Sequence, residues 1–339
     1  MGAMTPSPPF AVAPMMDRTD RHCRFFHRQL SRETLLFTEM VGADAVIHGD
    51  RRSLLAFDQV EHPVSLQLGG ADPQGLAEAA RIGAAWGYDE INLNVVCPSD
   101  RVQSGKFGAC LMLDPELVAR CVEAIRKAVN IRVTVKCRLG VDDQDVETAL
   151  DQLADAVIAA GADGVWVHAR KAWLQGLSPK QNRTVPPLDY DRVYRLKRRL
   201  PRFFVGVNGG IQGVAESQKH LEDVDGVMVG RVAFDRPGIL AGVDRALFGG
   251  SAVPTADAVI DAMVSYAEQQ VANGVHVGRV TRPMLGLFHG VPGARAWRRA
   301  LTEGAANRPH DANLIREAYE LVGDNHLLSE GAGRAPLAA

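Results

Sequence analysis

The stretch RVTVKCR, residues Arg132–Arg138, is short, rich in β-branched residues and of a suitable length for one β-strand. A stretch with helical spacing follows at Val146–Ala159, and a second β-rich run, Gly164–His168, comes next. A strand, a helix and a strand in this order are typical of a βα unit in a parallel sheet that is buried on both faces. This part of the chain therefore predicts an α/β fold.

The same alternation extends outward in both directions. Eight β-rich runs are candidate strands, namely Phe10–Met15, Leu35–Glu39, Val64–Leu68, Glu90–Val95, Arg132–Arg138, Gly164–His168, Phe203–Asn208 and Gly226–Gly230. Helical stretches lie between them, at Pro73–Trp86, Pro115–Val129, Val146–Ala159, Asp189–Arg199 and Val214–His220. Eight strands favour a (β/α)₈ TIM barrel over an open doubly wound sheet, which usually has fewer strands.

The alternation ends near Phe248. The next segment, Gly249–Pro254, is rich in Gly, Ser, Ala and Pro, which is typical of a linker. Beyond it, Ala256–Gly274 and Ala294–Leu301 have helical spacing. We therefore predict a TIM-barrel domain over residues 1–248 and a small, all-helical C-terminal domain over residues 255–330.

Composition excludes several classes of protein. The 339 residues are 46% hydrophobic and 23% charged, which excludes a disordered or fibrous chain. A net charge of −2 excludes a globally basic nucleic-acid binder but allows a local basic face. The five cysteines form no Cys-x-x-Cys pair, and no window is apolar enough to span a bilayer. We expect a cytosolic protein without a structural metal or a membrane segment, and take a monomer as the working expectation.

Polar residues at the ends of the candidate strands are informative, because the active site of a TIM barrel lies at the C-terminal ends of its strands. Gly209-Gly210 after the seventh run would let backbone N–H groups approach an anion, and Gly230-Arg231 after the eighth adds a guanidinium. We favour a phosphate site here. The alternative is that these glycines only shape tight turns.

A second group of polar residues suits a flavin ring. Lys136 and His168, with Gln67 and Asn94, offer several donors to a planar heterocycle, and a cation would stabilise an anionic reduced flavin. Each residue also has a structural alternative. Lys136 could form an ion pair, for instance with Glu39, and His168 could be a satisfied histidine at a strand end.

Cys97 follows the fourth β-rich run and precedes Pro98, at the start of a polar, glycine-containing segment. A nucleophilic role requires an adjacent base, and the sequence places no histidine near Cys97. A role as a proton donor fits better, because a thiol is mostly protonated at neutral pH. A buried apolar thiol is the better reading of the other cysteines, which are Cys23, Cys110, Cys121 and Cys137.

Two basic stretches predict a polyanionic partner. Residues 170–202 contain ten lysines and arginines against Asp189 and Asp191, a local balance of +8. In the predicted helical domain, six arginines between Arg279 and Arg308 face only Glu303 in the same stretch. Trp297 lies among them and could stack on a base. The alternative for each stretch is a solvated helix face.

Long motifs connect these observations to a known family. Residues Asn92–Cys110, NLNVVCPSDRVQSGKFGAC, strongly resemble the tRNA-dihydrouridine synthases, and within them the DusA subgroup. Further matching motifs are Ala13–Asp20, His168–Leu174, Gly176–Lys180, Asn208–Ile211, Gly286–Phe288 and Pro292–Arg299. The resemblance runs nearly end to end.

The resemblance implies the reduction of uridine to 5,6-dihydrouridine at U20 and U20a in the D-loop of tRNA. NADPH would reduce bound FMN, hydride would pass from flavin N5 to uracil C6, and Cys97 would protonate C5. By analogy, the flavin ring is lined by Pro14, Met15, Met16, Gln67, Lys136 and His168, and its phosphate is held by Asn208, Gly209, Gly210, Gly230 and Arg231. Asn94 would orient the base, and the residues expected to contact tRNA are Lys180, Arg183, Arg295 and Arg298.

One residue departs from the family pattern, which usually has Gly immediately before the catalytic cysteine. This chain has Val96, which would be strained if the position required a positive φ. Two alternatives therefore stay open. One is a tRNA-binding protein whose turnover is impaired by Val96, and the other is an FMN TIM-barrel oxidoreductase that acts on a small molecule.

Overall fold

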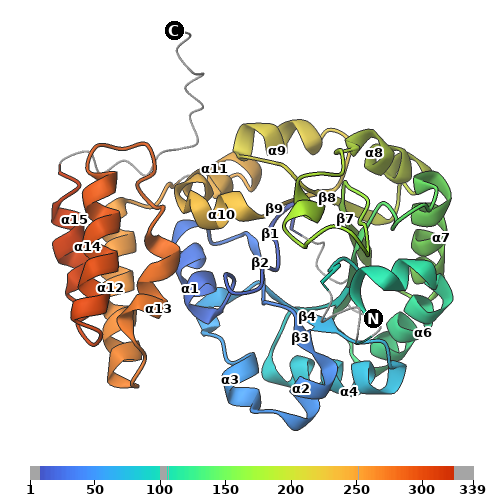
Figure 1. Cartoon of the computed structure of the whole chain (residues 1–339), viewed down its shortest axis with the longest axis horizontal. Coiled ribbons are helices and arrows are strands. Elements are labelled where there is room, and N and C mark those ends of the chain that lie inside the picture. The colour runs from blue at the N-terminus through green and yellow to red at the C-terminus, as the bar shows by residue number, and fades with distance from the viewer. Residues whose placement is uncertain (1–7, 100–104, 106, 251, 324–339) are drawn as a thin grey trace, which may run out of the picture. The chain divides into compact units, whose positions relative to one another are not determined.

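A computed structural model describes residues 8–99, 105, 107–250 and 252–323. Its centre is a closed barrel of eight parallel strands (Figure 1), which confirms the predicted TIM barrel. The strands are β1 (Phe10–Val12), β2 (Leu35–Phe37), β4 (Val64–Gly69), β5 (Glu90–Asn94), β6 (Arg132–Arg138), β7 (Gly164–His168), β8 (Phe204–Asn208) and β9 (Gly226–Val229). Pairing of β1 with β9 and of β2 with β4 closes the ring. An additional strand, β3 (Val41–Gly42), pairs with the end of β4 and was not predicted.

Helices cover the outside of the barrel. They are α2 (Ala43–His48), α3 (Arg51–Leu55), α4 (Pro73–Trp86), α6 (Pro115–Ala128), α7 (Val146–Ala159) and α8 (Tyr190–Arg199). A further helix, α9 (Val214–His220), follows β8 along the chain. Helix α4 begins and ends at residues that are typical of helix ends. The carboxylate of Asp72 accepts a hydrogen bond from the N–H of Gly75 at 2.7 Å and caps the first turn, and Gly87 ends the helix with φ of 99°. Short 3₁₀ turns lie at Gln59–Glu61, Gly108–Leu113, Gln181–Arg183, Pro237–Gly242 and Arg282–Met284.

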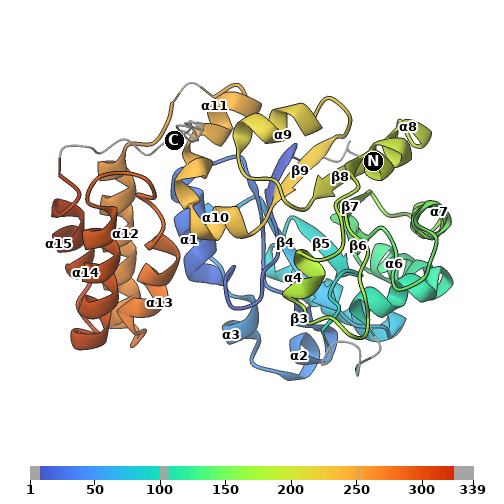
Figure 2. The same cartoon turned by 45° about the horizontal axis from the view of Figure 1, so that its top comes forward.

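The described chain divides into two compact units. Unit 1 comprises residues 8–16, 35–211 and 219–230 and contains the barrel, and unit 2 comprises residues 17–34, 212–218 and 231–323. The helices that lie wholly in unit 2 are α1 (Arg21–Leu30), α10 (Arg231–Asp235), α11 (Val243–Leu247), α12 (Ala256–Ala272), α13 (Val277–Thr281), α14 (Ala294–Asn307) and α15 (Leu314–Glu320). Helices α12, α14 and α15 run side by side (Figure 2). The helical C-terminal region is thus present. The domain limits at 248 and 255 stay a prediction. Parts of both predicted domains lie outside the described residues.

The sequence predicted no helix between the first two strands, yet α1 is there. Its carboxylate cap is Asp20, which accepts a hydrogen bond from the N–H of Cys23. Within unit 2, the ring of Phe25 stacks on Tyr266 of α12 with centroids 3.8 Å apart, and the imidazole of His22 contacts the Tyr266 hydroxyl at 2.9 Å. None of the helices in the described part of the chain is both long and apolar enough to cross a membrane.

The barrel interior has an apolar half and a polar half. Trp166 of β7 fills the apolar half, together with Ala11, Ala13, Leu35, Phe37 and Met228. Gly206 of β8 makes room for this ring, because a Cβ there would lie 2.2 Å from a ring carbon of Trp166. Side chains of β4, β5 and β6 form the polar half, and they are joined by hydrogen bonds rather than by apolar contact. A buried polar group costs free energy unless it is hydrogen-bonded, so this half is held by its mutual contacts.

Candidate active site

The Cys97 thiol lies on a turn that follows β5 and is half-buried. The side-chain oxygen of Asn94 accepts hydrogen bonds from the backbone nitrogens of Val96 at 3.3 Å and of Cys97 at 3.1 Å. The Cys97 sulfur lies 3.5 Å from the hydroxyl of Ser99. The Cys97 carbonyl accepts a hydrogen bond from the N–H of Ala109 at 2.9 Å, so the turn is fixed on both sides.

Val96 takes no strained conformation. Within the described residues, the non-glycine positions with a positive φ are Asp17 and Asp142. Strain from a β-branched side chain arises only in that region of backbone conformation. The strain that a positive φ would have caused at Val96 is therefore absent.

Arg138 of β6 is a site residue that the sequence did not single out. Its Nε donates to the carbonyl of Val96 at 3.0 Å, and its Nη1 donates to the carbonyls of Lys171 at 3.1 Å and Asn182 at 3.0 Å. Burial lowers the pKa of Arg138 to about 10, and a thiolate at Cys97 would oppose this shift. At neutral pH the guanidinium remains a cation. It connects the Cys97 turn to the segment that follows β7.

Lys136 and His168 lie on neighbouring strands of the rim. The Lys136 ammonium donates to the side-chain oxygen of Asn208 at 2.9 Å, and the Asn208 amide donates to the carbonyl of Met228 at 2.7 Å. Burial, and then the charge of Arg138, lower the pKa of Lys136 to about 7. The predicted alternative for Lys136, an ion pair with Glu39, is not the contact that the structure gives for its ammonium.

The rim carries unsatisfied polarity that fits a flavin. The Nδ1 atom of His168 is buried and has no hydrogen-bond partner within the described residues. Burial lowers the pKa of His168 well below its ordinary value, and four cations lower it further, namely Arg138, Lys136, Arg170 and Arg183. Lys136 and Arg138 are the buried members of this set, and buried cations favour an anionic ligand nearby. A ring that becomes anionic on reduction and carries a phosphate suits such a rim.

The residues of the predicted phosphate site are divided between the two units: the glycines belong to unit 1 and Arg231 belongs to unit 2. Gly209 and Gly210 follow β8 with φ of 119° and 77°, a conformation that favours glycine. A Cβ at Gly210 would lie 2.7 Å from Leu188 and 2.8 Å from the Tyr190 hydroxyl. These contacts explain why glycine is needed in this tight turn. They do not test whether the backbone N–H groups of Gly209 and Gly210 bind a phosphate. At Gly230, an added Cβ would lie 4.0 Å from the Cβ of Ala13, which is an ordinary van der Waals contact.

The structure brings several predicted residues together within unit 1. Gln67 donates to Asn92 and accepts from Asn94, each at 2.8 Å, so it lies beside the Cys97 turn. Cross-strand pairs align Asn94 with Lys136 and His168 with Asn208. The segment after β1 is more exposed, with Pro14 and Met15 half-buried and Met16 53% exposed. Arg231 follows Gly230 directly and begins α10 in unit 2.

Comparison with known proteins decides the family. The model of the dihydrouridine synthase (Dus) family matches residues 11–321 of the chain. The chain belongs to the dihydrouridine synthase family. The predicted membership, and with it the prediction of an enzyme, is confirmed.

Curated relatives in this family are similar over nearly their whole length. The tRNA-dihydrouridine(20/20a) synthase of Escherichia coli (strain K12) is 55% identical over 319 residues, which are 93% of this chain and 92% of the relative. The protein of the same name from Yersinia pestis is 51% identical over 325 residues, 95% of this chain and 94% of the relative. Among solved structures, the old yellow enzyme homologue from Zymomonas mobilis (NCR) matches with a TM-score of 0.53 at 14% identity and covers 74% of this chain and 91% of that one. That likeness is one of fold.

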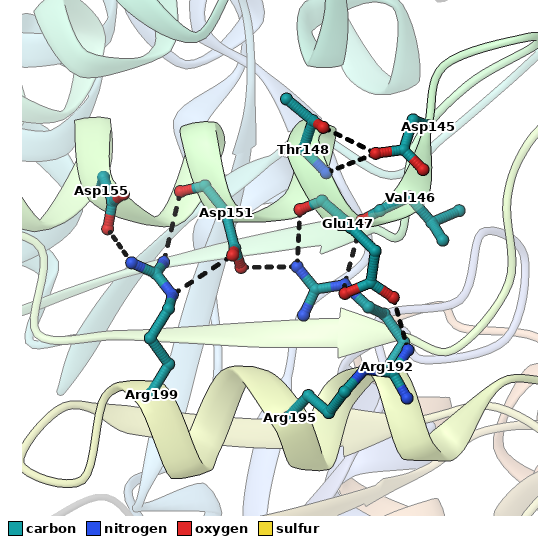
Figure 3. A network of polar contacts seen from close by, with 9 residues as sticks. All are labelled: Asp145, Val146, Glu147, Thr148, Asp151, Asp155, Arg192, Arg195 and Arg199. Carbon is teal, nitrogen blue, oxygen red and sulfur yellow. Dashed lines mark hydrogen bonds and ion pairs between the residues drawn. The ribbon is translucent and has the colours of Figure 1, made fainter.

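In this dihydrouridine synthase, half of the predicted basic stretch at 170–202 is neutralised. Helices α7 and α8 are joined by a ladder of ion pairs in which the acids of α7 face the arginines of α8 (Figure 3). The arginines are Arg192, Arg195 and Arg199, and their partners are Glu147, Asp151 and Asp155. Lys197 and Arg198 pair with Asp225 and Asp223. Five of the ten basic residues of 170–202 are thus ion-paired on α8, and the polyanion site over this stretch stays a prediction.

The exposed basic residues lie elsewhere on each unit. In unit 1, Lys180 and Arg183 are exposed at the turn Gln181–Arg183 or directly before it, and Trp173 is exposed as well. In unit 2, Arg295 and Arg298 are exposed on α14 and line a cavity of about 1020 Å³. Arg282, Phe234 and His289 also line it.

Trp297 corrects one expectation. Its ring is fully buried, its Nε1 donates to the carbonyl of Met284 at 3.0 Å, and it packs edge-on against Phe288. Stacking of Trp297 on a nucleic-acid base is therefore wrong. Its neighbours at Arg295 and Arg298 are exposed because they lie on other faces of the same helix.

Proposed function

We propose that this chain reduces uridine to 5,6-dihydrouridine at U20 and U20a of tRNA, with bound FMN and with NADPH as the reductant. The names of the relatives, tRNA-dihydrouridine(20/20a) synthase, support the substrate and the positions. The observation that carries the proposal is the thiol of Cys97 on a fixed turn, beside a rim where Lys136 and Arg138 are buried and the Nδ1 atom of His168 has no hydrogen-bond partner among the described residues. We further propose a cytosolic monomer.

The residues of the rim would bind the cofactor. Bound FMN would supply the hydride that adds to C6 of uracil, and NADPH would replace that hydride. Lys136 would offer a cation to the ring, His168 would offer its unpartnered Nδ1, and Gln67 its carboxamide. The other residues proposed to hold it are Pro14, Met15, Met16, Asn208, Gly209, Gly210, Gly230 and Arg231.

Cys97 would complete the reduction by giving a proton to C5 of uracil. The C5–C6 double bond then gains one hydride and one proton, and the thiolate that remains takes a proton from water. Arg138 is suited to support this thiolate, because its guanidinium is bound to the carbonyl of Val96 in the same turn. Asn94 would orient the base through the second hydrogen of its amide, since the first is donated to Gln67.

Lys180, Arg183, Arg295 and Arg298 are proposed to contact the tRNA backbone. All four are exposed, and they belong to different units. Phosphate contacts of this kind release counterions, so binding should weaken steeply as salt rises.

The test is a reaction of the FMN-loaded protein with NADPH and unmodified tRNA, with free uridine as a parallel substrate. We expect dihydrouridine in the tRNA at U20 and U20a and none from free uridine. Product from free uridine would favour a small-molecule oxidoreductase instead. Binding of tRNA without product would favour the binding-only alternative.

A further inference from the structure

A line of hydrogen bonds runs through the polar half of the barrel interior from Glu90 to the Cys97 turn. The Thr134 hydroxyl donates to the Glu90 carboxylate at 2.7 Å, and the Asn92 amide donates to the Thr134 oxygen at 2.8 Å. Gln67 donates to Asn92, and Asn94 donates to Gln67, each at 2.8 Å. The line ends where the Asn94 oxygen accepts from the backbone nitrogens of Val96 and Cys97. All of its side chains are buried.

All hydrogen bonds between the side chains of this line donate towards Glu90, which determines their direction. Glu90 also accepts from the Ser65 hydroxyl at 3.0 Å and from Arg132 at 3.4 Å, so both of its oxygens act as acceptors. Burial raises the pKa of Glu90, whereas Arg132 and the hydroxyls of Thr134 and Ser65 oppose this shift. The Oε1 atom accepts from both hydroxyls, so the Thr134 proton points to Glu90. Thr134 then accepts from Asn92, which leaves the Asn92 oxygen to accept from Gln67.

The same constraint passes along the two remaining carboxamides. Because Gln67 donates to Asn92, its oxygen faces Asn94 and accepts from the Asn94 amide. The Asn94 oxygen is thereby turned towards the backbone nitrogens of the Cys97 turn. If any one carboxamide were flipped, two donors or two acceptors would face each other inside the barrel.

We propose that Glu90, Thr134 and Asn92 are positioning residues, which hold the Asn94 carboxamide in the orientation that fixes the Cys97 turn. The expected effect on turnover rests on the proposed function. The expected effect on the position of the Cys97 turn does not. None of the three touches Cys97 directly in the structure. They act at a distance because each carboxamide has only one orientation that satisfies both of its neighbours.

Thr134 gives the sharpest test. Thr134→Val keeps the shape of the side chain and removes the hydroxyl, so it breaks the line, whereas Thr134→Ser keeps the hydroxyl. Ser65→Ala is the matched control, because Ser65 donates to the same Glu90 oxygen but lies outside the path to Cys97. The first readout is the rate at which iodoacetamide alkylates Cys97 in the full-length protein, measured on the Cys97 peptide by mass spectrometry with Cys110 as the internal reference. The second readout is kcat and KM for dihydrouridine formation in tRNA.

In Thr134→Val we expect Cys97 alkylation to rise by about fivefold, the factor that corresponds to one hydrogen bond of ordinary strength. We expect kcat to fall by about tenfold or more with KM for tRNA unchanged. Thr134→Ser and Ser65→Ala should stay within about twofold of the original protein in both readouts. Should Thr134→Val fail to fold, Asn92→Ala replaces it in the same measurements.

Two results would overturn the proposal. One is an alkylation rate in Thr134→Val that equals the original rate, and the other is an equal rise in Ser65→Ala. The outcome for the proposed function is separate. If no variant and no original protein forms dihydrouridine, the proposed function fails, while a selective rise in alkylation still supports the fixing of the turn.

Discussion

The side-chain oxygen of Asn94 lies 3.1 Å from the backbone nitrogen of Cys97 and accepts its hydrogen bond. Asn94 is the last residue of β5, so the reactive thiol is tied to a barrel strand. A site held by a strand is placed more accurately than one held by a loop alone. This contact holds the Cys97 thiol in a defined position at the end of β5.

We predict that Val96→Gly changes turnover by less than about threefold, because Val96 is not strained and glycine removes no hydrogen bond from the turn. The measurement is the initial rate of dihydrouridine formation in unmodified tRNA. A protein that forms product only after Val96→Gly would show that the valine impairs turnover.

Lys136→Met should stabilise the flavin-free protein at neutral pH while weakening its retention of FMN. Burial lowers the pKa of Lys136 to about 7, so the unfolded chain binds more protons than the folded chain between pH 7 and 10.5. Stability therefore rises with pH in that window, and at pH 7 the buried ammonium is a cost. We expect a gain of about 2 kcal/mol in the free energy of unfolding once the lost contact to Asn208 is allowed for.

The measurement for Lys136→Met is chemical denaturation with and without FMN. The gain should vanish near pH 10, where the lysine of the original protein is neutral in the folded state. A flavin-free Lys136→Met variant that is less stable than the original at pH 7 would contradict this account of the rim.

The ion pairs of α8 predict that two exposed arginines, Arg183 and Arg195, differ in their contribution to tRNA binding. Arg183→Gln should weaken tRNA binding and reduce the slope of log affinity against log salt by about one. Arg195→Gln should leave that slope unchanged, because Glu147 already balances Arg195. Filter binding over a range of salt concentrations measures both. Equal losses in the two variants would mean that the ion pairs of α8 open to bind tRNA.

His27 predicts an acid limit for unit 2. Burial lowers its pKa to about 4, and its Nε2 lies 3.0 Å from the carbonyl of Ala233. The unfolded chain therefore binds the extra proton, and stability is lost as pH falls from about 6.5 towards 4. Between pH 7 and pH 5 the original protein should lose about 2 kcal/mol more than His27→Gln. Urea denaturation at the two pH values gives this difference, and equal losses would place the acid sensitivity elsewhere.

Local patterns predicted much of the fold. The bounds of β6, β7, α4 and α7 agree with the sequence because each element carries its own signals, such as the Asp72 cap and the Gly87 end of α4. Helix α1 was missed because charged residues are frequent in its sequence. Its apolar residues, such as Cys23, Phe26 and Leu30, are recognised as one buried face only once the helix is packed in unit 2. Strand β3 was missed because it has two residues.

The site was predicted as a set of residues but not as a network. Cys97, Gln67, Lys136 and His168 stand at strand ends, which a TIM barrel makes informative. Arg138, Thr134 and Glu90 were not assigned, because their partners lie on other strands and only the register brings them together. The ion pairs of α8 were not predicted for the same reason, since the acids of α7 that form them lie outside the counted stretch. Trp297 was misread because no local signal shows that its face of α14 is buried.

Cys97 is proposed to supply the proton that completes the reduction of uridine in tRNA. The most direct measurement is the amount of dihydrouridine at U20 and U20a formed by Cys97→Ala, beside Cys110→Ala as the matched control and with FMN and tRNA binding measured on each. We predict that Cys97→Ala binds both and loses about 99% of the product rate, a factor in the range of general acid catalysis, while Cys110→Ala keeps the original rate. An unchanged rate in Cys97→Ala would contradict the account.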